Sequence, residues 1–188
     1  KNKIQKNNIG FPKNQGLYDS SNEHDSCGVG FIVDTNNHAS HDIVNKGLSM
    51  LCNLEHRGAV GADPKAGDGS GILIQLPHEF FKKEINHFEL PEQNEYAVGV
   101  FFIKKEEDLK DKILKKIEDV CARENIPFLG WRICPTYEDE LGWSVKPTTP
   151  FVYHMFVAKP DNISNQDDFE RKIYVLRQCI DKEIMLLG

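Results

Sequence analysis

Cys27 is the residue in this sequence best suited to act as a nucleophile. It begins a short apolar run, residues 27–33, in which glycines stand at positions 28 and 30. A cysteine thiolate attacks amide carbonyls readily, and glycines let other groups approach the backbone closely. A single cysteine beside a glycine also fits a small core residue, which is the commoner role. The choice between these two roles depends on the rest of the chain.

Two further segments carry polar side chains among glycines. His56 and Arg57 precede a glycine, and Asp68 lies within the run Gly67–Gly71. Arg57 fits two roles equally, orienting groups near the nucleophile or satisfying the carbonyls at a helix end. We interpret His56 as structural and Asp68 as a turn residue. The glycine run lacks the Gly-Lys-Ser/Thr ending and the following helix of a phosphate-binding loop.

The cysteine content favours free thiols. The five cysteines are an odd number, widely spaced and without a Cys-x-x-Cys pair. This pattern is typical of reduced thiols and predicts a cytoplasmic protein, with a plastid as the alternative. Two pairs, His38 with His41 and Cys52 with His56, have helix-face spacing, but a structural zinc site needs four converging ligands. We therefore expect no metal site.

The composition is that of an ordinary globular domain, with 188 residues and a net charge of −6. A mildly acidic chain binds the phosphates of nucleic acid poorly, and no apolar run is long enough to span a bilayer. We expect neither nucleic acid nor a membrane as a partner. Residues 1–26 are polar and lack periodicity, which predicts a leader segment.

Apolar periodicity predicts a mixture of strands and helices. Strands are expected at residues 27–33, 71–76, 96–104, 128–133 and 151–158, and helices at 40–55, 78–85, 106–123 and 167–185. Strands and helices do not alternate strictly, which favours antiparallel or mixed sheets covered by helices over a doubly wound parallel sheet.

Several motifs, taken in order and at their spacing, resemble the class II glutamine amidotransferases, and among these the glutamate synthases. The motifs are Leu17-Tyr18-Asp19, Glu23-His24-Asp25-Ser26-Cys27-Gly28, His56-Arg57-Gly58, Gly67-Asp68-Gly69-Ser70-Gly71, Tyr96-Ala97-Val98-Gly99, Gly130-Trp131-Arg132 and Pro135-Thr136. The resemblance runs from about Gly16 to the end of the chain.

This resemblance implies an α+β fold of the Ntn-hydrolase type, a four-layer αββα sandwich with mainly antiparallel sheets, incomplete in this chain. It implies that residues 1–26 are a leader or propeptide, removed so that Cys27 becomes the first residue, and that residues 27–188 begin the amidotransferase domain. It also implies glutamine as substrate and the remaining synthase domains as partners. FMN and an iron–sulfur cluster would belong to those domains, with no cofactor in this segment.

By the same resemblance, Cys27 hydrolyses glutamine through a thioester, and the ammonia serves glutamate synthesis from 2-oxoglutarate, an oxidoreductase reaction. Arg57 would support the nucleophile or the glutamine site. The other glutamine-binding groups are expected beyond Gly188, so we expect the isolated fragment to be inactive. Two alternatives stay open: another class II amidotransferase, and a non-catalytic Ntn-like fragment.

Overall fold

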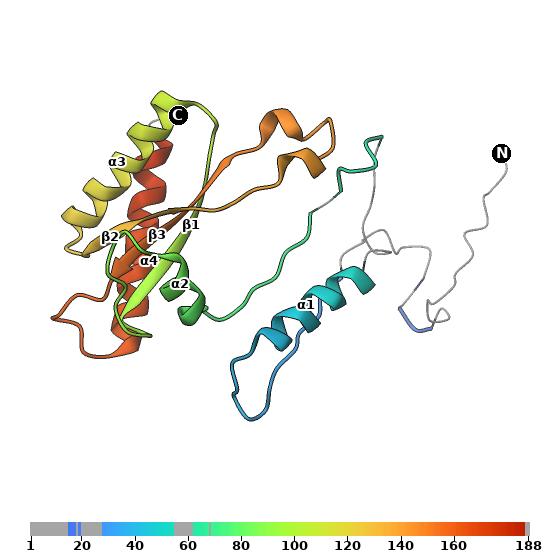
Figure 1. Cartoon of the computed structure of the whole chain (residues 1–188), viewed down its shortest axis with the longest axis horizontal. Helices are drawn as coiled ribbons and strands as arrows, with labels where there is room; N and C mark the ends of the chain where they lie inside the picture. Colours follow the sequence, from blue (N-terminus) through green and yellow to red (C-terminus); the bar gives the residue numbers. More distant parts are fainter. Residues whose placement is uncertain (1–14, 18, 20–27, 55–61, 68, 187–188) are drawn as a thin grey trace. The chain divides into compact units, whose positions relative to one another are not determined.

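The computed structural model describes residues 15–17, 19, 28–54, 62–67 and 69–186 (Figure 1). The chain forms two compact units. Unit 1 comprises Lys1–Gly61 and Gly67–Ile72, and unit 2 comprises Ala62–Ala66 and Leu73–Gly188. Each unit is described by itself below.

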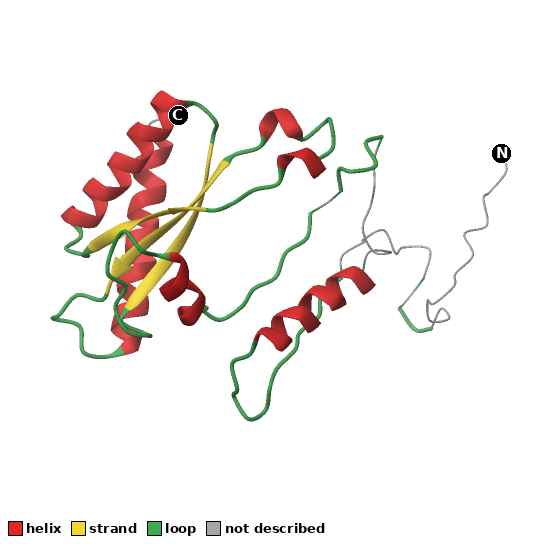
Figure 2. Ribbon diagram, viewed as in Figure 1, coloured by secondary structure: helices red, strands yellow, loops and turns green. Residues whose placement is uncertain are grey.

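Unit 2 is built on an antiparallel sheet of three strands (Figure 2). The strands are β1 (Tyr96–Ile103), β2 (Phe128–Ile133) and β3 (Phe151–Ala158), in the order β1-β3-β2. β1 pairs with β3 along its whole length, from Tyr96 opposite Ala158 to Ile103 opposite Phe151. Because side chains alternate along a strand, each strand contributes residues to both faces of the sheet.

Two helices cover one face of this sheet. These are α3 (Glu107–Arg123) and α4 (Gln166–Met185), which run in opposite directions in Figure 1. Their apolar stripes meet alternate side chains of the strands in one hydrophobic core. The most buried members of this core are Ile103, Ile113, Ile117, Val120, Cys121, Ile126, Tyr153, Met155, Val157, Leu176 and Ile180.

The ends of these helices follow from local sequence. Asn165 caps α4, its side-chain oxygen accepting a hydrogen bond from the Asp168 N–H at 2.8 Å. α3 ends where Asn125 adopts a positive φ of 54°. The next N–H, that of Ile126, then donates to the Cys121 carbonyl at 3.0 Å, which satisfies a carbonyl of the last turn.

The opposite face of the sheet is covered in part by α2 (His78–Glu84) and the segment after it. Phe156 is fully buried there, with the Phe81 ring centroid 5.0 Å from its own in an edge-to-face arrangement. Farther along β1 the same face is open: Val100 is 52% exposed and Phe102 71% exposed. This face therefore has a buried half and an exposed apolar half.

The connection between β2 and β3 leaves the sheet and returns. It contains two short 3₁₀ helices, η3 (Glu138–Glu140) and η4 (Lys146–Thr148). We call residues 138–149 the braced turn, because ion pairs and hydrogen bonds hold it at several points, as described below.

The described part of unit 1 consists of α1 (His41–Asn53) and the extended segments around it. Ser40 stands at the N-cap position, as predicted, but its side chain makes no cap hydrogen bond. The glycines at 28 and 30 contact residues near the end of this helix.

The element predictions from the sequence are confirmed for three strands and four helices, to within a residue or two at each end. The predicted strands at 27–33 and 71–76 are wrong for their described residues, which are extended but unpaired. A strand requires a neighbour for its N–H and C=O groups, and the described residues offer these segments none. The described fold is α+β, with helices on an antiparallel sheet, and none of its helices is long and apolar enough to span a membrane.

Candidate functional site

The residues singled out from the sequence, Cys27, His56, Arg57 and Asp68, lie outside the described residues. Their assignments therefore stay predictions. The structure does describe the residues that follow Cys27 and those that lie between Arg57 and the glycine run. These neighbouring residues determine what holds the candidate site.

The segment after Cys27 rests on α1 through its two glycines. A Cβ atom added to Gly28 would lie 3.0 Å from a methyl group of Leu54, and one added to Gly30 would overlap the side chain of Met50. In contrast, Val29 and Phe31 are 94% and 88% exposed. The glycines thus let the backbone approach the helix closely, as the sequence predicted, and the groups that approach it are side chains of α1.

Asp63 is a functional candidate that sequence analysis did not identify. It is only 5% exposed, and its carboxylate accepts three hydrogen bonds. The Ser144 N–H donates at 2.8 Å, the Ser144 hydroxyl at 2.7 Å and the Lys65 N–H at 3.1 Å. Led by the Ser144 N–H, these donors hold the pKa of Asp63 below its usual value, so the carboxylate is ionised at neutral pH.

Gly142 leaves the space that the Asp63 carboxylate occupies. A Cβ at position 142 would overlap both carboxylate oxygens. The turn that contains Gly142 and Ser144 therefore closes around Asp63. Only a residue without a side chain fits at position 142 while these hydrogen bonds are made.

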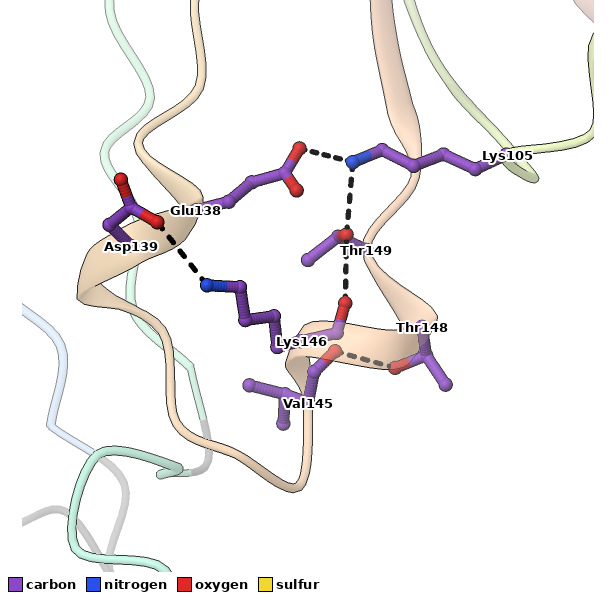
Figure 3. A network of polar contacts seen from close by, with 7 residues as sticks. All are labelled: Lys105, Glu138, Asp139, Val145, Lys146, Thr148 and Thr149. Atoms are coloured by element: carbon purple, nitrogen blue, oxygen red, sulfur yellow. Dashed lines mark hydrogen bonds and ion pairs between the residues drawn. The ribbon is translucent and has the colours of Figure 1, made fainter.

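The braced turn is also tied to the sheet (Figure 3). Lys105, just after β1, contacts Glu138 and donates to the Thr149 hydroxyl at 3.2 Å. Within the turn, Lys146 pairs with Asp139 at 3.2 Å. The hydroxyl of Thr149 in turn donates to the Lys146 carbonyl at 3.0 Å. Asp63 is thus attached to a turn that has its own connections to the end of β1.

The described cysteines include two whose surroundings oppose nucleophilic chemistry. Cys121 is fully buried, and burial, with the nearby Glu118 carboxylate, raises its pKa to about 11. Burial also raises the pKa of Cys134, although Arg132 partly offsets this. A raised pKa lowers the thiolate fraction at neutral pH, so neither thiol is a good nucleophile.

A polar pair lies on the partly open face of the sheet. Arg132 in β2 is opposite His154 in β3 and pairs with Glu84 at 3.2 Å. The Nδ1 atom of His154 is buried and lacks a hydrogen-bond partner among the described residues. Burial, followed by the charge of Arg132, lowers the pKa of His154, which is therefore neutral at pH 7. Such a nitrogen needs a partner from outside the described residues.

Across residues 28–54, 62–67 and 69–186, no three His, Cys, Asp or Glu side chains are grouped so that they could hold a metal ion. The sequence prediction that the chain has no metal site stays a prediction for the remaining positions. No resident cofactor is suggested by the side chains described above.

Comparison with known proteins identifies relatives for most of the chain. The chain is 42% identical to the glutamate synthase [NADPH] large chain of Bacillus subtilis over 168 residues, which are 89% of this chain and 11% of that protein. It is 41% identical to the glutamate synthase [NADH] of Saccharomyces cerevisiae, over 94% of this chain and 9% of that protein. It is 38% identical to the ferredoxin-dependent glutamate synthase of Pyropia yezoensis, over 88% of this chain and 11% of that protein.

The chain thus spans about a tenth of the length of these relatives. Residues 27–187 also match the model of the family described as glutamine amidotransferases class-II. The match covers most of the chain and contains both α1 and the whole sheet. On this ground the chain belongs to the class II glutamine amidotransferases.

Proposed function

We propose that this chain forms the first part of the glutamine-hydrolysing site of a glutamate synthase, with Cys27 as the nucleophile. The observation that carries the proposal is that the family match begins at residue 27. Residues 1–26 are then a leader, and residues 27–188 begin the amidotransferase domain. The relatives at 42, 41 and 38% identity all carry the name glutamate synthase, which supports this member of the family over the others.

The chemistry requires a free amino group on Cys27. An α-amine titrates near pH 8 and a thiol near pH 8.5, so the amine takes the thiol proton at about neutral pH. The thiolate attacks the side-chain amide carbon of glutamine, and the C–N bond breaks as ammonia leaves with a proton. Water then cleaves the glutamyl thioester to release glutamate and the thiol. A peptide nitrogen cannot accept the proton, so removal of the leader switches on the reaction.

The described neighbours of Cys27 support a fixed nucleophile. Its following residues contact Leu54 and Met50 of α1 through Gly28 and Gly30. This contact limits the positions that the adjoining backbone can take, which favours a single geometry for attack. Arg57, in this proposal, orients the nucleophile or the bound glutamine, and the oxyanion donors come from outside this chain.

We also propose that the complete domain is a four-layer αββα sandwich. The support lies on the face of the sheet opposite α3 and α4. There Val100 and Phe102 are exposed, and the Nδ1 atom of His154 lacks a described partner. A second sheet stacked on this face would bury the apolar pair and supply a hydrogen bond to the imidazole.

For the whole protein, we propose that the released ammonia serves glutamate synthesis from 2-oxoglutarate in other domains. FMN and an iron–sulfur cluster would reside there. The names of the three relatives differ in electron donor, NADPH, NADH or ferredoxin, at similar identity. The proposal therefore includes no choice of donor.

The test is the amino terminus and the turnover of the full-length protein. Mass spectrometry should find a mature chain that begins at Cys27, and this form should release ammonia from glutamine. Replacement of Cys27 by Ala should abolish the release, while a variant with an uncleaved Ser26–Cys27 bond should be equally inactive. Turnover by a protein whose Ser26–Cys27 bond is intact would contradict the proposed mechanism.

A further inference from the structure

The attachment of Asp63 joins a very short stretch of chain to unit 2. Ala62–Ala66 belongs to unit 2, whereas the residues before it, up to Gly61, and those after it, Gly67–Ile72, belong to unit 1. The chain thus enters unit 2 for five residues and leaves again. Of these five, Asp63 makes the buried contact, through three accepted hydrogen bonds.

The partner of Asp63 is distant in sequence and held in place. Ser144 lies 81 positions away and supplies two of the three donors. It belongs to the braced turn, which Lys105 connects to the end of β1 (Figure 3). A second, weaker contact runs alongside, since Lys65 approaches Glu140 at 3.8 Å, with both side chains mostly exposed. The buried carboxylate, rather than the exposed ion pair, is the effective anchor.

An anchor at Asp63 limits the positions available to the residues that precede it. Arg57 stands six positions earlier in the sequence. Six residues of extended chain span at most roughly 20 Å, and any turn shortens this reach. Releasing the anchor would enlarge the space that those residues can sample, and a group that binds substrate would then be less well placed.

We propose that Asp63 is a positioning residue for glutamine binding. Its carboxylate fixes the start of the segment 62–66 on the braced turn, and this holds the preceding Arg57 segment in the arrangement that binds glutamine. The inference rests on the proposed function, in which Arg57 supports the glutamine site. Asp63 itself touches no substrate and acts through the chain.

The test uses the full-length protein and steady-state hydrolysis of glutamine. Asp63→Asn keeps the shape of the side chain but places an amide N–H₂ against an N–H donor, whichever way the amide turns. We expect its KM for glutamine to rise by about tenfold, with kcat changed by less than about threefold. Ser144→Ala removes one of the three donors and should raise KM by a smaller factor. Ser144→Thr keeps a hydroxyl and should restore a KM near that of the wild type.

Lys65→Ala is the matched control, because it removes the exposed ion pair but keeps the backbone N–H that Asp63 accepts. Its KM should equal that of the wild type. A folded Asp63→Asn protein with an unchanged KM would overturn the inference, even if it melted at a lower temperature. If Asp63→Asn does not fold, the Ser144 pair decides, and equal KM values for Ser144→Ala and Ser144→Thr overturn it.

Cys27→Ala separates this inference from the proposed function. Wild-type turnover that Cys27→Ala abolishes, together with an unchanged KM in Asp63→Asn, rejects the anchor alone. Turnover that Cys27→Ala leaves intact rejects the proposed function and the anchor with it.

Discussion

Replacing Phe156 by Ala tests whether the second face of the sheet is a true core. Phe156 is fully buried in the central strand, and the ring centroids of Phe81, Phe88 and Tyr96 lie 5.0, 5.4 and 6.2 Å from its own. Truncating a buried Phe costs about 3–5 kcal/mol, and several aromatic neighbours place this site in the upper part of that range. We expect a loss of about 4 kcal/mol of unfolding free energy, a large share of the stability of a small domain.

Phe102→Ala is the matched control on the same face. Phe102 lies in β1 and is 71% exposed, so in the 188-residue chain its removal should change the unfolding free energy by no more than about 0.5 kcal/mol. In the full-length protein, a second sheet over this face would bury Phe102. The same substitution should then weaken the hydrogen-exchange protection of β1, because buried contacts control local opening.

The assay is equilibrium unfolding in urea, monitored by Trp131 fluorescence. Trp131 lies on the opposite face of the sheet, 5.7 Å from Phe101 and 6.0 Å from Tyr153 between ring centroids, so neither substitution removes its own neighbours. An unchanged m-value would show that both variants expose the same surface on unfolding. Equal losses for Phe156→Ala and Phe102→Ala in the 188-residue chain would refute the described burial. Unchanged protection of β1 in full-length Phe102→Ala would refute the second sheet.

Three further predictions concern the candidate site and the thiols. Gly30→Ala should lower kcat for glutamine by about tenfold, since the new Cβ overlaps Met50, and the double variant with Met50→Ala should recover most of it; a double variant no better than the single one would contradict this packing. Asp63 has a lowered pKa, so its contribution to stability is complete above the ordinary value of 3.8 and is lost as the pH falls through the native pKa. The difference in unfolding free energy between wild type and Asp63→Asn should therefore shrink between pH 7 and about pH 3, and a constant difference would argue against an ionised anchor. Buried Cys121, with a pKa of about 11, should resist iodoacetamide in the native state at pH 8 and react after unfolding, whereas exposed Cys52 should react in both states, as peptide mass mapping can show.

The sequence predicted the elements with strong periodicity but not their arrangement. The helix of residues 107–123 and the strands of 96–103 and 151–158 were found because charged and apolar residues alternate at a clear period. The strand order β1-β3-β2 was not predicted, since consecutive strands pair more often than not, and here β1 and β2 are both edges of β3. The extended segments 28–33 and 71–76 have a strand-like pattern but lack a described neighbour. Pattern reports a preference for an extended backbone, and pairing depends on what else is present.

The candidate site divides in the same way between local and distant causes. The glycines at 28 and 30 carry a local signal, because alternate glycines indicate close approach on one side of an extended segment, and α1 lies on that side. Asp63 carries no such signal. A lone acid in a stretch of glycine and alanine looks like a solvated turn residue, and its partner Ser144 is 81 positions away. Only the fold brings a hydroxyl, two N–H groups and a vacant Cβ position together around one carboxylate. An acidic residue in such a glycine-rich loop is therefore better judged by the donors that surround it than by the residues beside it in sequence.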